Sequence, residues 1–560
     1  MKNFWNYLVA LFVVGNLLGS CAKPSYVAPN EQSIISDFYA TLDGNGRGRM
    51  FESTISNDTI YVNIDYYYPI DSDNEVDISK LILKANLPVD AKVSPSLEGF
   101  TDLTNPLHLT VTAGDGSQSK YVVVANKKGN TNVTLANLTY EDLTGVTQEV
   151  SAIIIGNDIN FSLVPGTVMN NPRFTYTINK HGSGSIVNGG SVNLDNDLPF
   201  VVTSAGNAKK TYTLKVIEAK KLEKGIRQGS AKILFAKKMK ADLGINDNHM
   251  TTGIGVSGKY IVLNTRGENS VYIDMVTGQK VGEVDMTGFK GNLRNFYMTS
   301  DDAGHLLVNN LTANDGNTFM IYKIMGVDKT PEPFISWNTG GAGYGRKVSV
   351  TGDITKNAII TVARVGLATQ NSFARWQVVN GNLVSQTPEI VNINGFSWTW
   401  NNADLIYTNP TSLTSDYYIA GYSVNKLAKI SGTTNTLSQS NTALDANFVA
   451  NTVDYLEFNS AKFVAYNHIN GFTWGSADQV FLLDAEMPLS GNPSASSSTP
   501  GLIWAAPKNT YGANGAGNTV NANTTGDIKM AISENGYFLY LYFMMTNGYV
   551  VGVQFDCVDI

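Results

Sequence analysis

The stretch that decides the fold is Thr251–Met286, which reads TTGIGVSGKYIVLNTRGENSVYIDMVTGQKVGEVDM. It contains four short runs of β-forming residues, separated by turn residues at Ser257–Gly258, Gly267–Asn269 and Thr277–Gly278. Short strands joined by tight turns are typical of a small antiparallel sheet in which each strand pairs with the next one. One propeller blade has this pattern, so the stretch predicts a blade rather than half of a sandwich.

Similar runs recur through the rest of the C-terminal region, after the charged junction Lys220–Gly225. The final unit has only three runs, and Ala231–Ala236 is the predicted fourth strand that would close the ring and remove two sheet edges. We therefore expect a β-propeller of about six blades. The innermost strands are expected to begin near Thr252, Arg294, Lys347, Phe396, Asp454 and Asp527.

The N-terminal half carries a repeated pair of patterns. Residues 57–62 (NDTIYV) are echoed by 157–162 (NDINFS), and the hairpin-like segment 108–124 is echoed by 200–216. The two patterns recur after about 91 to 100 residues. A repeat of this length is typical of tandem Ig-like β-sandwiches, although chance similarity between generic strands stays open. The fold class predicted for the whole chain is therefore all-β: two Ig-like sandwiches followed by a propeller.

The N-terminus predicts export and lipidation. Lys2 precedes the apolar run Leu8–Leu18, which is too short to span a bilayer comfortably, and Leu18-Gly19-Ser20-Cys21 follows it. This tetrapeptide resembles the lipobox of bacterial lipoproteins, which implies that Cys21 is lipidated after cleavage; an ordinary signal peptide with a chance cysteine is the alternative. The predicted divisions of the chain are a signal peptide 1–20, a tether 21–33, Ig-like domains 34–128 and 129–220, and a propeller 226–560.

The amino-acid composition argues against a nucleic-acid partner and against a disulfide. Charged residues make up 16% of the 560 residues and the formal net charge is -7, which disfavours a nucleic-acid partner because phosphate binding needs a basic face. Cys21 and Cys557 are the only cysteines in the sequence, so lipidation of the first leaves the second without a disulfide partner.

No short motif in the sequence indicates a specific ligand or reaction. Gly253–Lys259 fits both glycine-rich nucleotide patterns, but the strand-like Tyr260–Leu263 follows where a helix is needed, so we expect no nucleotide. The acidic stretch 71–77 has calcium-like spacing but Val76 where an EF-hand needs glycine, and its expected role is a solvated loop. The five histidines are scattered, and no catalytic signature occurs, so we expect no metal, no cofactor and no catalytic residue.

Aromatic residues of the C-terminal region are the candidate ligand contacts. An indole ring offers a flat apolar face and one N–H donor, which suits stacking on a sugar ring, but large aromatics also fill the wedges between blades. Packing and ligand binding therefore both stay open. The candidates are Trp398, Trp400, Trp474, Trp376, Tyr344 and Tyr511.

With its lipobox, Ig-like modules and Trp-bearing C-terminal domain, the chain resembles Bacteroidetes outer-membrane lipoproteins of polysaccharide-utilisation systems. The resemblance implies a lipid-anchored, non-catalytic protein that captures glycan at the cell surface. Ala22-Lys23-Pro24-Ser25 replaces the acidic residues that often follow the cysteine in surface-exported members, so a periplasmic orientation stays open. Two alternatives remain: a protein-binding or adhesion lipoprotein with an outer-membrane protein partner, and a propeller-type glycan hydrolase or lyase, for which paired carboxylates need not be close in sequence.

Overall fold

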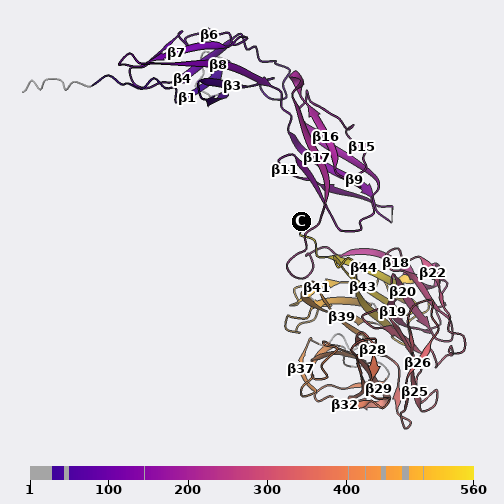
Figure 1. Ribbon diagram of the computed structural model, residues 1–560. Coiled ribbons are helices and arrows are strands. Elements are labelled where there is room, and N and C mark those ends of the chain that lie inside the picture. Colours follow the sequence, from indigo (N-terminus) through magenta and orange to yellow (C-terminus); the bar gives the residue numbers. More distant parts are fainter. Residues whose placement is uncertain are drawn as a thin grey trace, which may run out of the picture. The chain divides into compact units, whose positions relative to one another are not determined.

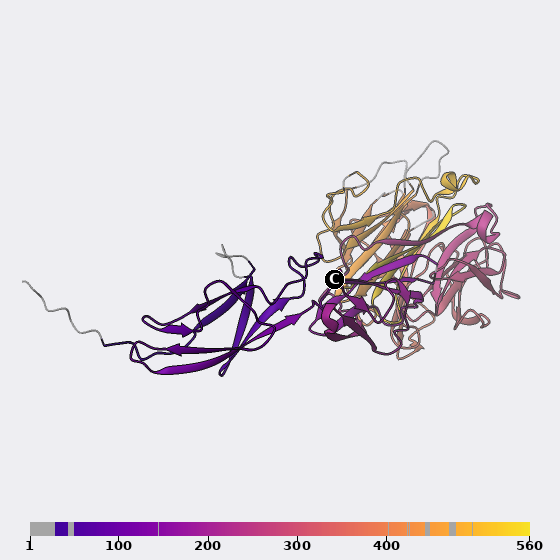
Figure 2. The ribbon, with the colours of Figure 1, turned by 90° about the horizontal axis from the view of Figure 1, so that it is seen from above.

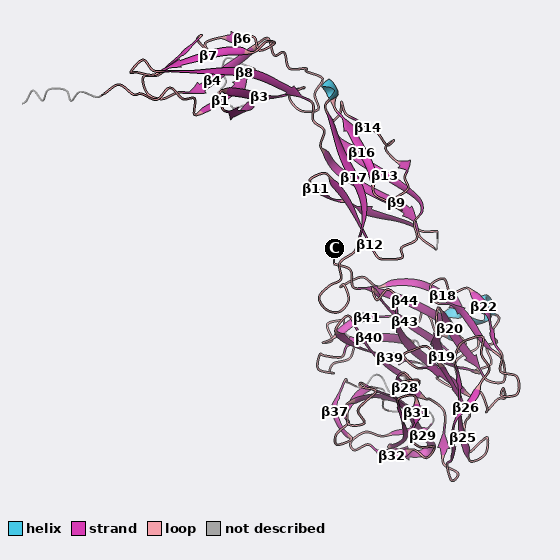
Figure 3. Ribbon diagram, viewed as in Figure 1, coloured by secondary structure: helices cyan, strands magenta, loops and turns pink. Residues whose placement is uncertain are grey.

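The computed structural model is all-β, as predicted, with only short helical segments among its strands (Figures 1 and 3). It describes residues 28–559 except 43–49, 144, 401–402, 423, 425, 443–448, 470–477 and 496. The predicted signal peptide (residues 1–20), Cys21 and Trp474 lie outside the described residues. The chain divides into two compact units: unit 1 comprises Met1–Leu163 with Thr167–Ile217, and unit 2 comprises Val164–Gly166 with Glu218–Ile560.

The first half of unit 1 is an eight-stranded sheet with the order β5-β7-β8-β3-β2-β1-β4-β6. In β3, Ile60, Val62 and Ile64 are buried and alternate with more exposed residues, because side chains of a strand point to opposite faces. Strand β3 pairs parallel with β8. The strands are β1 (Asp37–Thr41), β2 (Phe51–Ser56), β3 (Thr59–Asp65), β4 (Leu81–Asn86), β5 (Lys92–Ser94), β6 (Phe100–Thr101), β7 (Leu107–Thr112) and β8 (Gln118–Lys128).

The second half of unit 1 has two sheets, β10-β9-β13-β15 and β11-β12-β17-β16-β14, around a shared core that includes Phe161, Phe174 and Phe200. The repeated sequence patterns occupy equivalent places: β3 neighbours the β7–β8 hairpin, and β12 neighbours the β16–β17 hairpin. The elements are β9 (Val133–Glu141), β10 (Thr147–Ser151), β11 (Ile153–Ile155), β12 (Asp158–Leu163), β13 (Asn170–Ile178), β14 (Ser183–Gly184), β15 (Gly190–Ser191), β16 (Leu198–Thr203), the 3₁₀ helix η1 (Ala205–Asn207) and β17 (Lys209–Glu218).

Unit 2 contains six antiparallel sheets, and the stretch Thr251–Met286 forms one of them, with the order β19-β20-β21-β22. Figures 1 and 2 show the unit from two directions at right angles, coloured from magenta to yellow. The elements up to the third sheet are β18 (Lys232–Lys238), α2 (Met239–Leu243), β19 (Thr251–Ser257), β20 (Tyr260–Thr265), β21 (Ser270–Asp274), β22 (Lys280–Val284), β23 (Tyr297–Ser300), β24 (Leu306–Asn309), β25 (Thr318–Ile324), β26 (Glu332–Asn338), β27 (Gly343–Tyr344), β28 (Ser349–Gly352), β29 (Ala358–Gln370), β30 (Ser372–Val379), β31 (Asn382–Leu383), β32 (Glu389–Asn392) and β33 (Trp398–Trp400). The remaining elements are β34 (Ala403–Tyr407), β35 (Tyr417–Gly421), β36 (Leu427–Ser431), β37 (Thr436–Ser440), β38 (Val453–Phe458), β39 (Ala461–His468), β40 (Gln479–Asp484), β41 (Leu502–Ala505), α3 (Ala513–Ala516), β42 (Gly526–Ile532), β43 (Phe538–Met545) and β44 (Tyr549–Asp556).

The ends of unit 2 meet within one sheet. Strand β18 pairs antiparallel with β44, which completes the sheet β18-β44-β43-β42, and Figure 1 shows the two strands side by side. The predicted closing strand is therefore confirmed. The pairing of β18 with β44 satisfies backbone groups that would otherwise form open sheet edges.

Six strands, one from each sheet, contact one another in a cycle, β19-β23-β28-β34-β38-β42, and β42 returns to β19. These six are called the first strands below. A Cβ atom added at Gly253 would collide with the Met298 backbone, and one added at Gly255 would lie 2.7 Å from Leu306 Cδ2. The glycine-rich motif thus serves close packing of β19 against β23, and the strand β20 follows it, as the sequence indicated.

One predicted strand start was wrong. The fourth first strand was expected near Phe396, but β34 begins at Ala403, and β33 (Trp398–Trp400) instead pairs with β29 of the preceding sheet. The cause is the length of β29, which continues beyond β28 and offers β33 a pairing edge.

Candidate functional site

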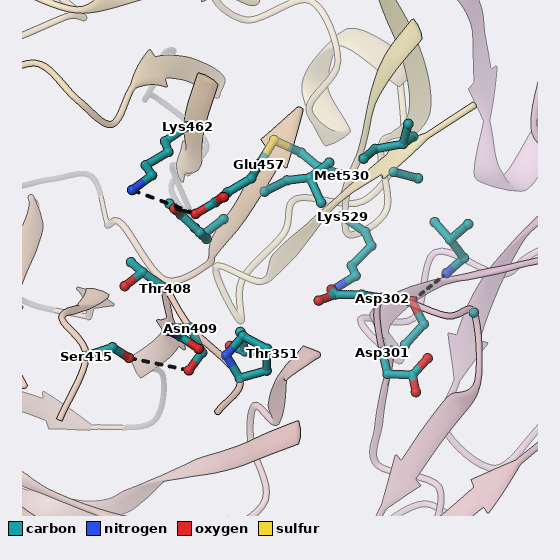
Figure 4. A pocket seen from close by; sticks show the side chains of 18 residues that line it. Asp301, Asp302, Thr351, Thr408, Asn409, Ser415, Glu457, Lys462, Lys529 and Met530 are labelled. Carbon is teal, nitrogen blue, oxygen red and sulfur yellow. Dashed lines mark hydrogen bonds and ion pairs between the residues drawn. The ribbon is translucent and has the colours of Figure 1, made fainter. Parts of the chain in front are cut away.

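A pocket of about 660 Å³ lies where the first strands of unit 2 end, and every one of the six sheets contributes to its lining (Figure 4). Its volume falls within the range of about 300–1,000 Å³ that is usual for small-molecule sites. Hydroxyl, amide, carboxylate and ammonium groups dominate the labelled side chains. The first strands or the loops that directly follow them provide, in chain order, Val256, Asp302, Thr351, Asn409, Glu457 and Lys529.

Lys529 of β42 provides a buried cation at this pocket, with a side chain that is 6% exposed. Burial alone would lower the pKa of Lys529, but the Asp454, Asp302 and Asp301 carboxylates together raise it, so the ammonium stays charged. Its only hydrogen bond among the described residues is a long one, 3.5 Å, to Asp454 Oδ1. Because an ammonium group carries three N–H donors, the described part of the chain leaves donors of Lys529 Nζ without an acceptor.

Asp302 lies opposite Lys529, and the two side chains point toward one another in Figure 4. One of its carboxylate oxygens, Oδ2, accepts a hydrogen bond of 2.7 Å from the Gly352 backbone N–H. The side chain is accessible from the pocket, yet desolvation by the surrounding protein raises the pKa of Asp302, and the charge of Lys529 opposes that rise. The pair therefore places one acceptor group and one donor group at the same place in the pocket.

The rim of the pocket is polar and more exposed. Glu457 Oε1 accepts a hydrogen bond of 2.8 Å from the Tyr455 hydroxyl and lies 3.9 Å from Lys462 Nζ. Thr408 and Asn409, directly after β34, add a hydroxyl and an amide to the lining. Such side chains offer hydrogen bonds in both directions to a polyhydroxylated ligand.

A buried polar network joins the first strands at the centre of unit 2. Asp527 of β42 accepts hydrogen bonds from Lys347 Nζ (2.7 Å), the Thr452 hydroxyl (2.9 Å), the Tyr297 hydroxyl (2.9 Å) and the Ile254 backbone N–H (2.8 Å). The ion pair with Lys347 is nearly inaccessible, at 2% and 1% side-chain exposure. With Asp527 on its own sheet and the four partners on or next to strands of four others, these groups join five of the six sheets, so their role is structural rather than ligand binding.

Two further aspartates belong to the same buried layer. Desolvation raises the pKa of Asp404 to about 6, and Ser349 donates a hydrogen bond to its carboxylate. Desolvation also raises the pKa of Asp454 to about 6, although the charge of Lys529 opposes this. Asp404, Asp454 and Asp527 each stand second in β34, β38 and β42, so the position repeats from sheet to sheet.

In the part of the chain that the structure describes, Asp301, His305 and Asp353 form a group whose ligand atoms all lie within 4.8 Å of one another. The oxygens of Asp301 already accept hydrogen bonds from the His305 backbone N–H (2.8 Å), His305 Nδ1 (2.9 Å) and the Ile354 backbone N–H (2.8 Å). This cluster organises the turn after β23, and nothing else about it indicates a metal ion.

The acidic stretch 71–77, predicted to be a solvated loop, also forms hydrogen bonds and an ion pair with the second half of unit 1. Asp71 Oδ1 accepts hydrogen bonds from Asn179 Nδ2 (2.6 Å) and the Lys180 backbone N–H (2.8 Å). Asp73 pairs with Lys180 at 2.9 Å, and the His181 ring stacks on Tyr67 at 3.9 Å. These carboxylates therefore serve contacts within unit 1.

The structure places the predicted aromatic contacts inside unit 2, away from this pocket. Trp398 is 0% exposed and its Nε1–H donates to the Arg364 carbonyl, while Trp376 is 2% exposed and donates to the Gln386 carbonyl. Tyr344 is 3% exposed and contacts Trp337 edge to face. Of the two roles left open for these residues, burial supports packing: the rings fill space within and between the sheets, where aromatic packing is most favourable.

Tyr511, the remaining described candidate, is 8% exposed and packs edge to face against Phe543 and Tyr549. It too is a core residue of unit 2. The backbone of Trp400 belongs to β33, but its side chain lies outside what the structure describes, as does the whole of Trp474. For these two residues ligand contact stays a prediction.

Sequence reasoning missed all of the residues that line the pocket. One signal was available: Lys529 stands inside the otherwise apolar Ile528–Ala531, and a charged residue within a buried strand usually has a specific partner. Asp301 and Asp302, directly after the β23 segment, gave a second signal, because loops at strand ends commonly carry function.

Comparisons with known proteins add the family. Residues 233–556 match a domain of unknown function, DUF8500, and residues 16–125 match another domain of unknown function, DUF5018. No curated protein matches the chain. Within the described residues, no helix is both long and apolar enough to cross a membrane.

Three solved structures are similar at low identity. A DUF4623 family protein from Bacteroides eggerthii is 14% identical (76% of this chain, 98% of that chain, TM-score 0.45), and a putative glycoside hydrolase from Bacteroides thetaiotaomicron is 23% identical (24% and 35%, TM-score 0.15). Hydrazine synthase from Kuenenia stuttgartiensis is 14% identical (54% and 78%, TM-score 0.28). Similarity this remote says nothing about what the chain binds. The match over residues 233–556 covers more than half of the sequence, so the chain belongs to the DUF8500 family of domains of unknown function.

Proposed function

We propose that this protein is a non-catalytic, glycan-binding lipoprotein, anchored through Cys21 to the outer membrane and facing the cell exterior. In this proposal unit 1 consists of two Ig-like modules that act as a spacer. Unit 2 is a six-bladed β-propeller whose central mouth is the pocket lined by Asp302 and Lys529. The cyclic contacts of the six first strands and the β18–β44 pairing support the propeller reading.

The observation that carries the proposal is the chemistry of the pocket. A lining rich in hydroxyl, amide, carboxylate and ammonium groups matches a ligand with many hydroxyls, which can donate and accept at each position. The lining also includes apolar patches at Val256, Met530 and Ile532, against which the C–H faces of a sugar ring can pack. The proposed ligand site is therefore this pocket, in place of the aromatic residues that the sequence suggested.

A second candidate function is glycan hydrolysis or lyase chemistry. It is favoured by Asp302, a pocket carboxyl group whose pKa is raised by desolvation, together with the exposed carboxylate of Glu457 in the same lining. A carboxyl group with a raised pKa is the usual general acid of glycosidases, and a second carboxylate completes the pair.

The test is a titration of the soluble protein, residues 22–560, against a panel of bacterial, plant and host glycans by calorimetry. Saturable binding without release of new reducing ends or unsaturated products is the expected result. Product formation would instead favour the hydrolase or lyase. Absence of binding across the whole panel would count against glycan capture and in favour of the protein-binding alternative.

A further inference from the structure

The pocket contains a charged pair that is incompletely satisfied by the protein. Lys529 Nζ makes a single long hydrogen bond, 3.5 Å to Asp454 Oδ1, among the described residues. Asp302 uses Oδ2 for the Gly352 backbone N–H, and no hydrogen bond to its Oδ1 comes from the part of the chain that the structure describes. Lys529 is buried and needs partners, whereas Asp302 is exposed toward the pocket, so a molecule that enters can complete the hydrogen bonds of the first and reach Oδ1 of the second.

Building on the proposed function, we propose that Lys529 and Asp302 together bind two neighbouring hydroxyl groups of a neutral sugar and discriminate against acidic sugars. One hydroxyl accepts a hydrogen bond from the Lys529 ammonium, and the next donates one to the Asp302 carboxylate. A hydroxyl group is both donor and acceptor, so a vicinal diol satisfies both charges without adding one of its own.

Acidic sugars fit this arrangement poorly. The carboxylate of a uronic acid is an acceptor only, and it would meet Asp302 and Glu457 in the lining, with Asp454 behind Lys529. The lining carries three carboxylates and two ammonium groups, so a further negative charge is opposed.

The test compares matched pairs of oligosaccharides that differ in charge: galactan against galacturonate, mannan against mannuronate, and glucan against glucuronate. Calorimetry on residues 22–560 should detect binding to at least one neutral member and at least tenfold weaker binding to its acidic counterpart. Tighter or equal binding of the acidic member would overturn the proposed selectivity while leaving glycan capture intact.

Variants separate the pair from the general charge of the protein. Asp302→Asn keeps an oxygen for the Gly352 N–H but removes the charge, and it should weaken binding of the neutral oligosaccharide roughly 10- to 100-fold, the loss typical of one hydrogen bond to a charged group. It should also strengthen binding of the acidic counterpart. Lys529→Met should weaken neutral binding by a similar factor.

The matched control is Glu283→Gln on β22, which makes the same change in net charge at an exposed site outside the pocket lining. It should leave binding within twofold of the parent. Because Lys529→Met leaves the buried Asp454 without its ion pair, tryptophan fluorescence must first establish that this variant folds; Asp302→Asn tests the proposal in either case. Unchanged neutral binding in Asp302→Asn would overturn the role of the pair, whereas a parent protein that binds no glycan at all would overturn the proposed function and this inference with it.

Discussion

Replacing Asp527 with alanine should destabilise unit 2 more than most single substitutions can. The carboxylate accepts hydrogen bonds from Lys347, Thr452, Tyr297 and the Ile254 backbone, which belong to four different sheets. Its loss leaves the Lys347 ammonium, at 2% side-chain exposure, with the Gly526 carbonyl at 2.7 Å as its remaining hydrogen-bond acceptor among the described residues. Removing one partner of a buried ion pair typically costs about 3–5 kcal/mol, so we expect a decrease of that size in the free energy of unfolding.

Urea unfolding followed by tryptophan fluorescence measures this decrease in unit 2 alone, because every tryptophan except Trp5, in the predicted signal peptide, lies after residue 218. The double variant Lys347→Met/Asp527→Leu removes both charges and should recover part of the loss, because it leaves no unpaired ammonium but still deprives the Tyr297 hydroxyl and the Ile254 N–H of their acceptor. Asp285→Ala, at a loop position, is the control and should change stability by less than about 0.5 kcal/mol. A loss below about 1 kcal/mol in Asp527→Ala would refute the view that this carboxylate holds the first strands together.

Three further predictions concern acidity, packing and the anchor. Burial raises the pKa of Asp404 to about 6, above its value in the unfolded chain, so ionisation of this carboxyl group destabilises the fold above pH 6. As the pH falls from 7 to 4, the free energy of unfolding of the parent relative to Asp404→Asn should therefore rise by up to about 3 kcal/mol. A difference between the two proteins that does not vary with pH would contradict this. Trp398→Phe loses the bond to the Arg364 carbonyl and some core volume, which should lower stability by about 1–3 kcal/mol and leave glycan binding unchanged; a loss of binding in a folded variant would return Trp398 to the ligand site. Cys21→Ser should move the protein from the membrane fraction to the soluble fraction in cell fractionation, and a variant that stays with the membrane would argue against lipidation.

The general architecture was predictable because it depends on local signals. Turn residues at short, regular spacing define strands such as β19–β22, and alternation of buried and exposed residues defines strands such as β3. The closing strand β18 was also predictable, because a three-stranded final unit leaves an edge that needs a partner.

The site was not predictable from the same signals. An indole such as Trp398 has the same appearance in sequence whether it packs in the core or faces a ligand, and only the tertiary contacts of β29 and β33 bury it. The pocket brings together Asp302 and Lys529, which are more than 200 residues apart in the sequence, and that meeting depends on the cyclic order of the sheets. The start of β34 was misplaced for a related reason, because β33 is extended but belongs to another sheet.

The central claim is that ligand enters the mouth pocket of unit 2, and blocking that pocket tests it most directly. Ile532 lies at the end of β42 in the pocket lining and is 42% exposed, so Ile532→Trp should place an indole into the pocket with little effect on the fold. Ile390 on β32 is 45% exposed and is not among the pocket-lining residues, which makes Ile390→Trp the matched control. Calorimetric titration with galactan, mannan and glucan oligosaccharides should give saturable binding in the parent and the control and none in Ile532→Trp. Undiminished binding in a folded Ile532→Trp variant would contradict the account.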